Sequence, residues 1–250
     1  NAISDKQIIE QLCLIDQDLQ QLISAWSVAE LRFQRSTKHS CCKDVGFSIE
    51  FFNKFTHTMM TSILSLSSEK ERVNMITRVI KLCEMSKEIN QLNLARMFMS
   101  SLENACIYRL KKTHKKLSQS VLKQRSNLAE VLSNNRAYGG MKTFINKVRA
   151  KNEAHMQYRG SYLTDLTFIE EGYKKFLPYL HDPSIQVPNY NKLVMQAKII
   201  RELRGVDCVP YSFTVDNDVR NLIIELLVTQ QPTDEEVYQR SLQLEPRKKQ

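Results

Sequence analysis

The chain has 250 residues, 42% of them hydrophobic and 25% charged, and its formal net charge is +9. This composition is typical of a soluble globular protein with a sizeable core, and no apolar run approaches the roughly 20 residues that span a bilayer. The sequence starts at Asn1 without a signal-peptide pattern, so we expect a cytoplasmic protein of which these residues are a fragment.

The first 177 residues contain no proline, so they are free to be helical throughout. Apolar residues recur there at helical spacing, most clearly over 69–89, where Ser67 and Ser68 precede the segment as candidate caps. Strict strand alternation is absent, which predicts an all-α fold. The predicted helices cover 6–24, 49–64, 69–89, 93–110, 118–133 and 141–151, and the pair Gly139-Gly140 is expected to separate the last two.

The region after residue 160 has a different organisation. Helices are predicted over 161–171 and about 191–204, where Gly205 ends the second one. One face of this second helix carries Leu193, Ala197, Ile200 and Leu203. The connection between the helices is stiffened by Pro178, Pro183 and Pro188. We therefore predict one domain over 1–250, in which a helical hairpin at about 161–204 projects from a core built from residues 6–150.

The sequence contains no recognisable catalytic or metal-binding motif. The six cysteines and five histidines lack metal-ligand spacing, and nucleophile motifs and glycine-rich phosphate loops are missing. Cys41 and Cys42 are neighbours in a basic, loop-like stretch and are assigned no function. We expect no metal, no cofactor and no enzyme with covalent chemistry.

The net charge of +9 indicates an acidic partner, and nucleic acid, an anionic membrane and an acidic protein surface all qualify. Basic residues are densest in YRLKKTHKKL at 108–117, where a helix spreads them over more than one face. Since the stretch lacks an arginine-rich or aromatic binding signature, it indicates a solvated helix surface. We therefore expect no nucleic-acid partner.

Residues 161–172, SYLTDLTFIEEG, form a largely apolar segment with threonines set into it, and two adjacent glutamates and a glycine close this segment. On a helix, a polar stripe within a sector of roughly 60° comprises Thr164, Thr167 and Glu171. A second, largely apolar stripe beside it comprises Leu163, Leu166 and Glu170. From the pattern alone, the favoured interpretation is a helix packed on the core with its polar face in solvent.

The same segment resembles a known motif. YLTDLTFIEEG at 162–172 resembles the helical-hairpin signature of the catalytic domain of guanine-nucleotide exchange factors for Ras-like small GTPases, the family of Son of sevenless. Further matches follow in the family's order along nearly the whole chain. They include IIEQLCLID at 8–16, FFNKFTHTMMTSIL at 51–64, the stretches 71–93 and 100–114, YNK at 190–192, PY at 210–211 and SLQLEPR at 241–247.

The chain departs from the family pattern at the base of the hairpin. EAHMQYRG at 153–160 stands where family members usually carry a stretch such as PCVPFLG, and only the glycine is kept. The prolines that stiffen the hairpin base in relatives are therefore missing. Leu92 and His114 replace an aromatic residue and a tryptophan, and a helical module that precedes the domain and braces the hairpin in several relatives is absent from this fragment.

The resemblance implies an exchange factor that acts on a Ras-family small GTPase, preferentially in its nucleotide-free state. The hairpin would enter between the two switch segments and expel nucleotide and magnesium. The resemblance assigns catalytic roles to Glu171, which would reach the phosphate-binding loop, and to Thr164 and Thr167, which would face the switches and the magnesium region. Residues expected to bind the GTPase are Asn93, Asp165, Phe168 and Glu170.

Such a factor needs no cofactor and no direct membrane insertion, and would work at membranes where its GTPase is anchored. The motifs fit partners of the Ras, Rap and Ral types alike. The missing prolines at 153–158 keep open an alternative, in which the same fold serves as a non-catalytic scaffold or binding module.

Overall fold

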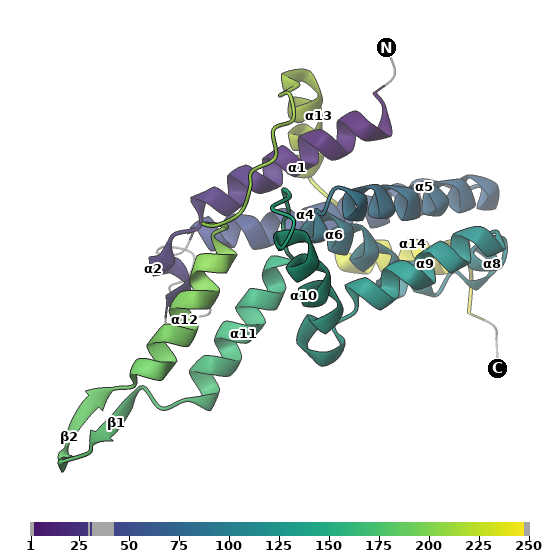
Figure 1. The fold of residues 1–250 in the computed structure, drawn as a ribbon. Helices are drawn as coiled ribbons and strands as arrows, with labels where there is room; N and C mark the ends of the chain where they lie inside the picture. The colour runs from purple at the N-terminus through teal and green to yellow at the C-terminus, as the bar shows by residue number, and fades with distance from the viewer. Residues whose placement is uncertain (1–2, 30, 32–42, 248–250) are drawn as a thin grey trace.

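The computed structural model describes residues 3–29, 31 and 43–247. Thirteen helices and one two-stranded ribbon lie within these residues (Figure 1). The helices are α1 (Asp5–Leu22), α2 (Ala25–Val28), α4 (Lys43–Ser65), α5 (Glu69–Glu88), α6 (Leu92–Glu103), α7 (Ala105–Tyr108), α8 (Lys111–Lys115), α9 (Gln119–Leu132), α10 (Asn135–Arg149), α11 (Arg159–Gly172), α12 (Tyr190–Leu203), α13 (Asn217–Val228) and α14 (Asp234–Leu244). The all-α prediction is confirmed. Cys41 and Cys42 lie outside the described residues.

Side-chain caps begin several of these helices. Ser4 and Gln7 form a capping box at α1, and the Ser68 hydroxyl accepts from the Glu71 backbone N–H at the start of α5. Asn104 ends α6 and its side chain accepts from Cys106 at the start of α7. The predicted helix 93–110 is therefore two helices, because an asparagine that caps the backbone competes with helix continuation.

The main core lies between α1, α4, α5, α6 and α9. Five apolar positions of α5 recur at helical spacing. Ile76, Val79, Ile80 and Cys83 are fully buried in this core, and Val73 is partly buried at its edge. Phe55 of α4 meets Phe98 of α6 edge-on, with ring centroids 5.0 Å apart. Most of the buried residues lie within 6–150, where the core was predicted, but the core extends beyond this range, because α13 and α14 add Val219, Ile223, Leu227 and Val237 to it. That residues 1–250 form one domain stays a prediction.

The predicted helix break at Gly139-Gly140 is wrong in position. The chain turns left-handed three residues earlier, with φ between 50° and 63° at Arg136, Ala137 and Tyr138, and both glycines lie in the helix that follows. Gly140 serves packing instead, because a Cβ there would lie 2.8 Å from the carbonyl oxygen of Val131 on α9. The glycine allows α9 and α10 to approach closely.

The basic stretch 108–117 is tied to the C-terminal segment. The Glu245 carboxylate accepts from the backbone N–H groups of Lys112 and Thr113, each at 2.9 Å, and the Arg109 guanidinium donates to the Glu245 carbonyl oxygen at 2.8 Å. These contacts join the RLKKT and SLQLEP motifs. The side chains of Lys111, Lys112, Lys115 and Lys116 are exposed, as expected for a solvated helix surface.

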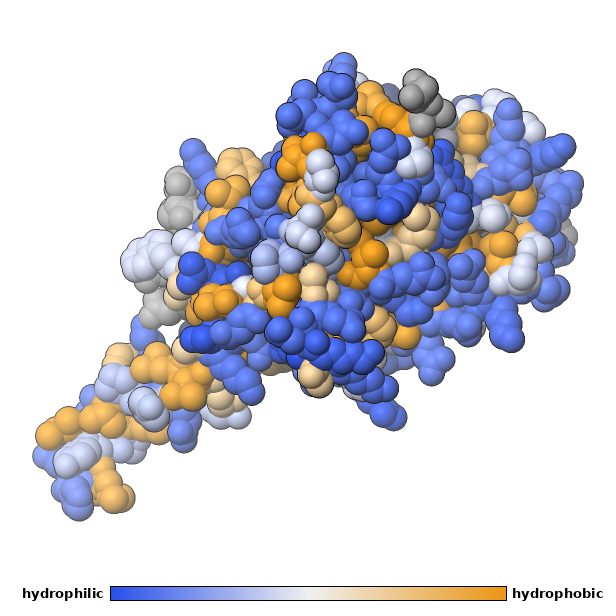
Figure 2. Space-filling model, turned by 45° about the horizontal axis from the view of Figure 1, so that its top comes forward, coloured by the Kyte–Doolittle hydropathy of each residue, from blue (hydrophilic) through white to orange (hydrophobic). Residues whose placement is uncertain are grey.

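The hairpin of α11 and α12 projects from this body, and β1 (Phe176–Tyr179) pairs with β2 (Asp182–Pro188) at its far end (Figure 1). Its base packs on a small second core, separate from the first, that comprises Ile23, Val28, Val45, Tyr162, Leu166 and Leu203. The projecting hairpin is thus confirmed. The antiparallel ribbon was not predicted, and Figure 2 shows apolar surface along this projection.

Candidate functional site

The base of the hairpin is held by a buried polar network that joins α1, α6 and the start of α11. The Arg159 guanidinium pairs with the Asp16 carboxylate, and both side chains are at most 5% exposed. The Asn93 amide donates to both oxygens of Asp16 at 3.0 Å and accepts from the Arg159 backbone N–H at 3.3 Å. Gln91 also donates to Asp16, at 3.0 Å. Because buried charges are costly unless paired and hydrogen-bonded, this network fixes where α11 begins.

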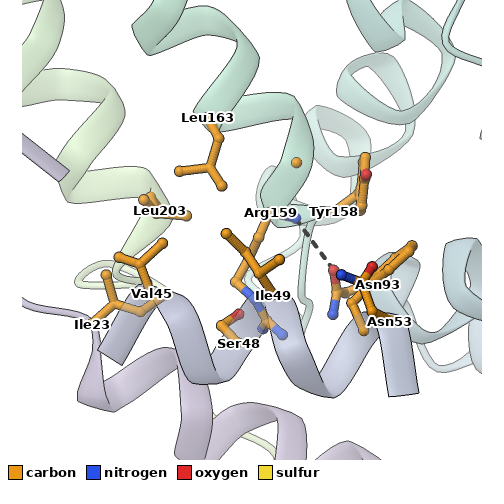
Figure 3. A pocket seen from close by; sticks show the side chains of 12 residues that line it. Ile23, Val45, Ser48, Ile49, Asn53, Asn93, Tyr158, Arg159, Leu163 and Leu203 are labelled. Atoms are coloured by element: carbon orange, nitrogen blue, oxygen red, sulfur yellow. Dashed lines mark hydrogen bonds between the residues drawn. The ribbon is translucent and has the colours of Figure 1, made fainter. Parts of the chain in front are cut away.

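A pocket of about 210 Å³ lies beside the network, between the hairpin and α4 (Figure 3). Val45 and Ile49 of α4 line it, together with Leu163 of α11 and Leu203 of α12. Asn93 and Arg159 also contribute to the lining, so the buried network borders this apolar recess.

Gly160, the one residue kept from the family stretch before the hairpin, lies under an aromatic cluster. The Tyr158 ring packs against Phe52 and Tyr138, with centroids 5.7 and 5.3 Å away. A side chain at position 160 would overlap the Tyr158 ring. The structure therefore gives this glycine a packing role at the first turn of α11.

Lys192 fastens the two helices of the hairpin together. Its side chain is 5% exposed, and its ammonium donates to the carbonyl oxygens of Glu170 and Tyr173, at 3.2 and 3.0 Å, at the C-terminal end of α11. It also pairs with the Glu170 carboxylate at 3.0 Å, which accepts from Gln196 at 2.9 Å. A cation at a helix C-terminus satisfies carbonyls that lack partners within the helix and complements the helix dipole.

The outer side of α11 is open to solvent at its end. Phe168 is 59% exposed. Glu171 is exposed, and its carboxylate makes no hydrogen bond or ion pair within 3–29, 31 and 43–247. Leu166, by contrast, is 1% exposed in the second core, so the prediction that the apolar stripe faces the body is confirmed at this residue.

The remaining predicted residues of α11 are only partly exposed. The hydroxyls of Thr164 and Thr167 donate to carbonyl oxygens four residues earlier, at 2.8 and 2.9 Å. Asp165 pairs with Lys142 of α10 at 2.7 Å. The end of α11 thus presents the Phe168 ring and the Glu171 carboxylate, which has no partner among the described residues, and the side chains beside them are bonded to α10, to α12 or to α11 itself.

A sequence model of the RasGEF domain matches residues 7–194. The chain belongs to the RasGEF domain family. Three curated relatives agree with this assignment. Ras guanine nucleotide exchange factor A of Dictyostelium discoideum is 27% identical over 254 residues, which cover 99% of this chain and 41% of that protein.

Ras guanine nucleotide exchange factor E of the same organism is 29% identical over 171 residues, which cover 68% of this RasGEF chain and 16% of the relative. Ras-specific guanine nucleotide-releasing factor 2 of Rattus norvegicus is 26% identical over 247 residues, with coverage of 98% and 20%. The chain therefore spans less than half the length of each of these relatives.

Two features are absent from the described part of this RasGEF domain. Across the part of the chain that is described, no helix combines the length and the apolar character that crossing a membrane requires. Within the same residues, no three side chains suited to metal ligation come together.

The structure brings six of the seven predicted site residues of the RasGEF domain together on α11 and places the seventh below the surface. Asn93 is 1% exposed, and its amide is occupied by Asp16 and by the backbone of Arg159. No sequence pattern pointed to the roles of Asp16, Arg159 and Lys192. One signal was present, because an arginine directly before Gly160 stands where the family usually has an apolar residue.

Proposed function

We propose that this RasGEF domain accelerates nucleotide exchange on a Ras-family small GTPase by inserting the α11–α12 hairpin between the switch segments. The observation that carries the proposal is the state of Glu171. It lies exposed at the end of a projecting helix, and its carboxylate has no partner among the described residues. A carboxylate left unpaired beside the tightly bonded Glu170 is available to a partner protein.

Four side chains of α11 form the proposed contact surface: Thr164, Thr167, Phe168 and Glu171. Glu171 would meet the phosphate-binding loop and replace contacts that the departing phosphates made. The two threonines would face the switches and the magnesium region, and Phe168 would bury its ring against the GTPase.

Asp165 and Glu170 belong to the margin of this surface. They are 23% and 28% exposed, and Lys142 and Lys192 already pair with them. Asn93 supports the surface from beneath, through Arg159, and does not contact the GTPase itself. This assignment revises the role that the resemblance implied for Asn93.

Exchange of this kind requires no covalent step and no cofactor. Nucleotide weakens the binding of the exchange factor to the GTPase by a certain factor. By thermodynamic linkage, the exchange factor weakens the binding of nucleotide to the GTPase by the same factor. The abundant nucleotide then rebinds and displaces the factor. We propose that this takes place in the cytoplasm, at membranes where the GTPase is anchored, without insertion of the domain and without nucleic acid.

Release of fluorescent nucleotide from purified GTPases of the Ras, Rap and Ral types tests this function. At least one of them should release nucleotide faster with the parental chain, and Glu171→Ala should abolish most of the acceleration. Gel filtration should give a complex with the nucleotide-free GTPase that excess GDP or GTP dissolves.

The second candidate function is a non-catalytic binding module, favoured by the loss of the prolines at 153–158. A complex that is indifferent to nucleotide, with no acceleration of release on any of the three GTPases, would support this alternative and overturn the exchange function.

A further inference from the structure

Arg149, the last residue of α10, occupies a junction between three segments. Its Nε donates to Nε2 of His155 at 3.2 Å, one terminal nitrogen donates to the Glu202 carboxylate at 3.2 Å, and the other donates to the Tyr162 hydroxyl at 3.1 Å. Tyr162 belongs to α11, Glu202 to α12 and His155 to the segment between α10 and α11. All three guanidinium nitrogens thus have different partners.

The Tyr162 hydroxyl extends this junction into the hairpin base. It donates to the Gln157 side chain at 2.9 Å, and Gln157 in turn donates to the Ser161 hydroxyl at 2.9 Å. Burial works to lower the pKa of Arg149, but Tyr162 and Glu202 outweigh it and raise that pKa. The guanidinium is therefore charged at neutral pH.

The apolar contacts of the hairpin are few and lack directional preference. Within the described residues, the buried apolar cluster between hairpin and body is the second core, where Tyr162, Leu166 and Leu203 of the hairpin meet Ile23, Val28 and Val45 of the body, and this cluster is separate from the main core. Hydrophobic burial is non-directional, whereas the planar fork of an arginine holds its partners at defined angles. The segment 153–158 contributes no proline to fix the angle.

We propose that Arg149 is a positioning residue, which sets the angle between the hairpin and the body by holding α11 and α12 to the end of α10. This inference rests on the proposed exchange function. A hairpin that enters another protein has to arrive with its reactive face correctly aligned, and misplacements on the order of 1 Å can cost about a hundred-fold in rate. Loss of the Arg149 contacts should therefore reduce the fraction of docked hairpins whose orientation allows nucleotide release.

The test measures nucleotide release as a function of exchange-factor concentration. For Arg149→Met we expect the maximal release rate to fall roughly ten-fold or more, with a smaller change in the half-saturating concentration. Arg149→Lys should restore little of the release rate, because an ammonium cannot reproduce the planar arrangement of donors in a guanidinium. Glu202→Gln keeps a carbonyl acceptor for Arg149 and should stay near the parental rate, whereas Glu202→Ala should not.

Arg201→Gln is the matched control. Arg201 neighbours Glu202 on α12, but among the described residues its guanidinium pairs with Asp207 alone, at 2.5 and 2.6 Å, and its side chain is 62% exposed. Removing it should leave the maximal rate unchanged. All assays are run well below each variant's melting temperature, so that a purely structural role of Arg149 would not alter the rate per folded molecule.

A second readout needs no GTPase. Spin labels carried by non-natural residues at the exposed positions 180 and 123 report the distance between the hairpin tip and α9, and Arg149→Met should shift or broaden that distance distribution. Parental release rates and an unchanged distribution in Arg149→Met would overturn the inference. If the parental chain accelerates no GTPase, the exchange function fails, while the distance measurement still decides the role of Arg149.

Discussion

Glu170 and Glu171 are adjacent on α11, yet α12 holds only the first. The Glu170 carboxylate accepts from Lys192 and Gln196 at 3.0 and 2.9 Å, whereas Glu171 is exposed and makes no such contact within the described residues. Successive helical residues point about 100° apart, so one carboxylate closes the hairpin while the other faces outward. Of the two adjacent glutamates, the first therefore has a structural role in the hairpin, and the second is left for contact with a partner protein.

Glu171→Ala should reduce exchange far more than it reduces stability. Removing an exposed, unpaired side chain creates no cavity, so the free energy of unfolding should change by no more than about 0.5 kcal/mol. The loss should fall on the nucleotide-free complex, where we propose that this carboxylate acts. Melting curves and nucleotide-release rates check this, and a Glu171→Ala variant with the parental release rate would contradict it.

Glu170→Ala should show the opposite balance. It removes the carboxylate that pairs with Lys192, a side chain that is 5% exposed, although two carbonyl oxygens still accept from its ammonium. Leaving a buried donor partly unsatisfied costs about 1–3 kcal/mol. Glu170→Gln keeps an acceptor and is the control, and equal denaturant midpoints for Glu170→Ala and the parent would refute the closing role of Glu170.

Leu166→Ala should loosen the hairpin without touching its outer face. Leu166 is 1% exposed in the second core, and truncating a buried leucine costs about 2–5 kcal/mol, depending on how far the site collapses. Leu180→Ala is the comparison, because Leu180 is 87% exposed in the turn of the ribbon and its loss should change stability by less than about 0.5 kcal/mol. A similar melting temperature for both variants would contradict the second core.

Local patterns predicted the helices and the hairpin because both depend on neighbouring residues. The 3.6-residue period of α5 and the positions of the prolines are properties of short segments. They can be read without knowing which distant residues the segment contacts. The ribbon escaped prediction for a related reason. Its strands are exposed along most of their length, so no core imposed an apolar alternation, and the prolines indicated only a stiff connection.

The burial of α12 shows where local patterns fail. Leu193 and Ala197 were predicted on its apolar face, but both are exposed, whereas Lys192 and Gln196 are buried against α11. The polar residues are buried because α12 packs against the end of α11. That end supplies carbonyl oxygens and a carboxylate, which need hydrogen-bond donors as partners. Likewise, Asp16 and Arg159 are 143 residues apart, a separation that no spacing rule covers.

Acidification should weaken the fold through two histidines, of which His114 is partly buried and His155 is buried. Burial is the largest cause that lowers the pKa of His114 and of His155. Below the ordinary histidine pKa of about 6.5, the unfolded chain therefore binds more protons than the folded one, and stability falls with pH until the folded forms are also protonated. Urea midpoints measured between pH 7.5 and pH 5 should decrease, and His114→Gln should make the decrease shallower. A midpoint independent of pH in this range would contradict the prediction.

The Asp16–Arg159 pair should couple strongly in a double-mutant cycle. Arg159→Leu, which restores the kind of residue the family carries there, leaves a buried carboxylate with only the amides of Asn93 and Gln91, and should cost about 3–5 kcal/mol. Asp16→Asn should also destabilise, since the guanidinium then loses its counter-charge. In the double variant neither uncompensated charge remains.

The double variant should therefore be less destabilised than the sum of the single variants by at least about 1 kcal/mol. Denaturant unfolding of the four proteins gives this coupling energy, and additive effects would mean that the pair contributes through packing alone. Nucleotide release by the double variant then separates two roles of the network. A stable double variant that exchanges slowly would indicate that the charges align the first turn of α11. A neutral leucine and an asparagine can fill the space of the ion pair, but they do not fix the backbone of position 159 against Asn93.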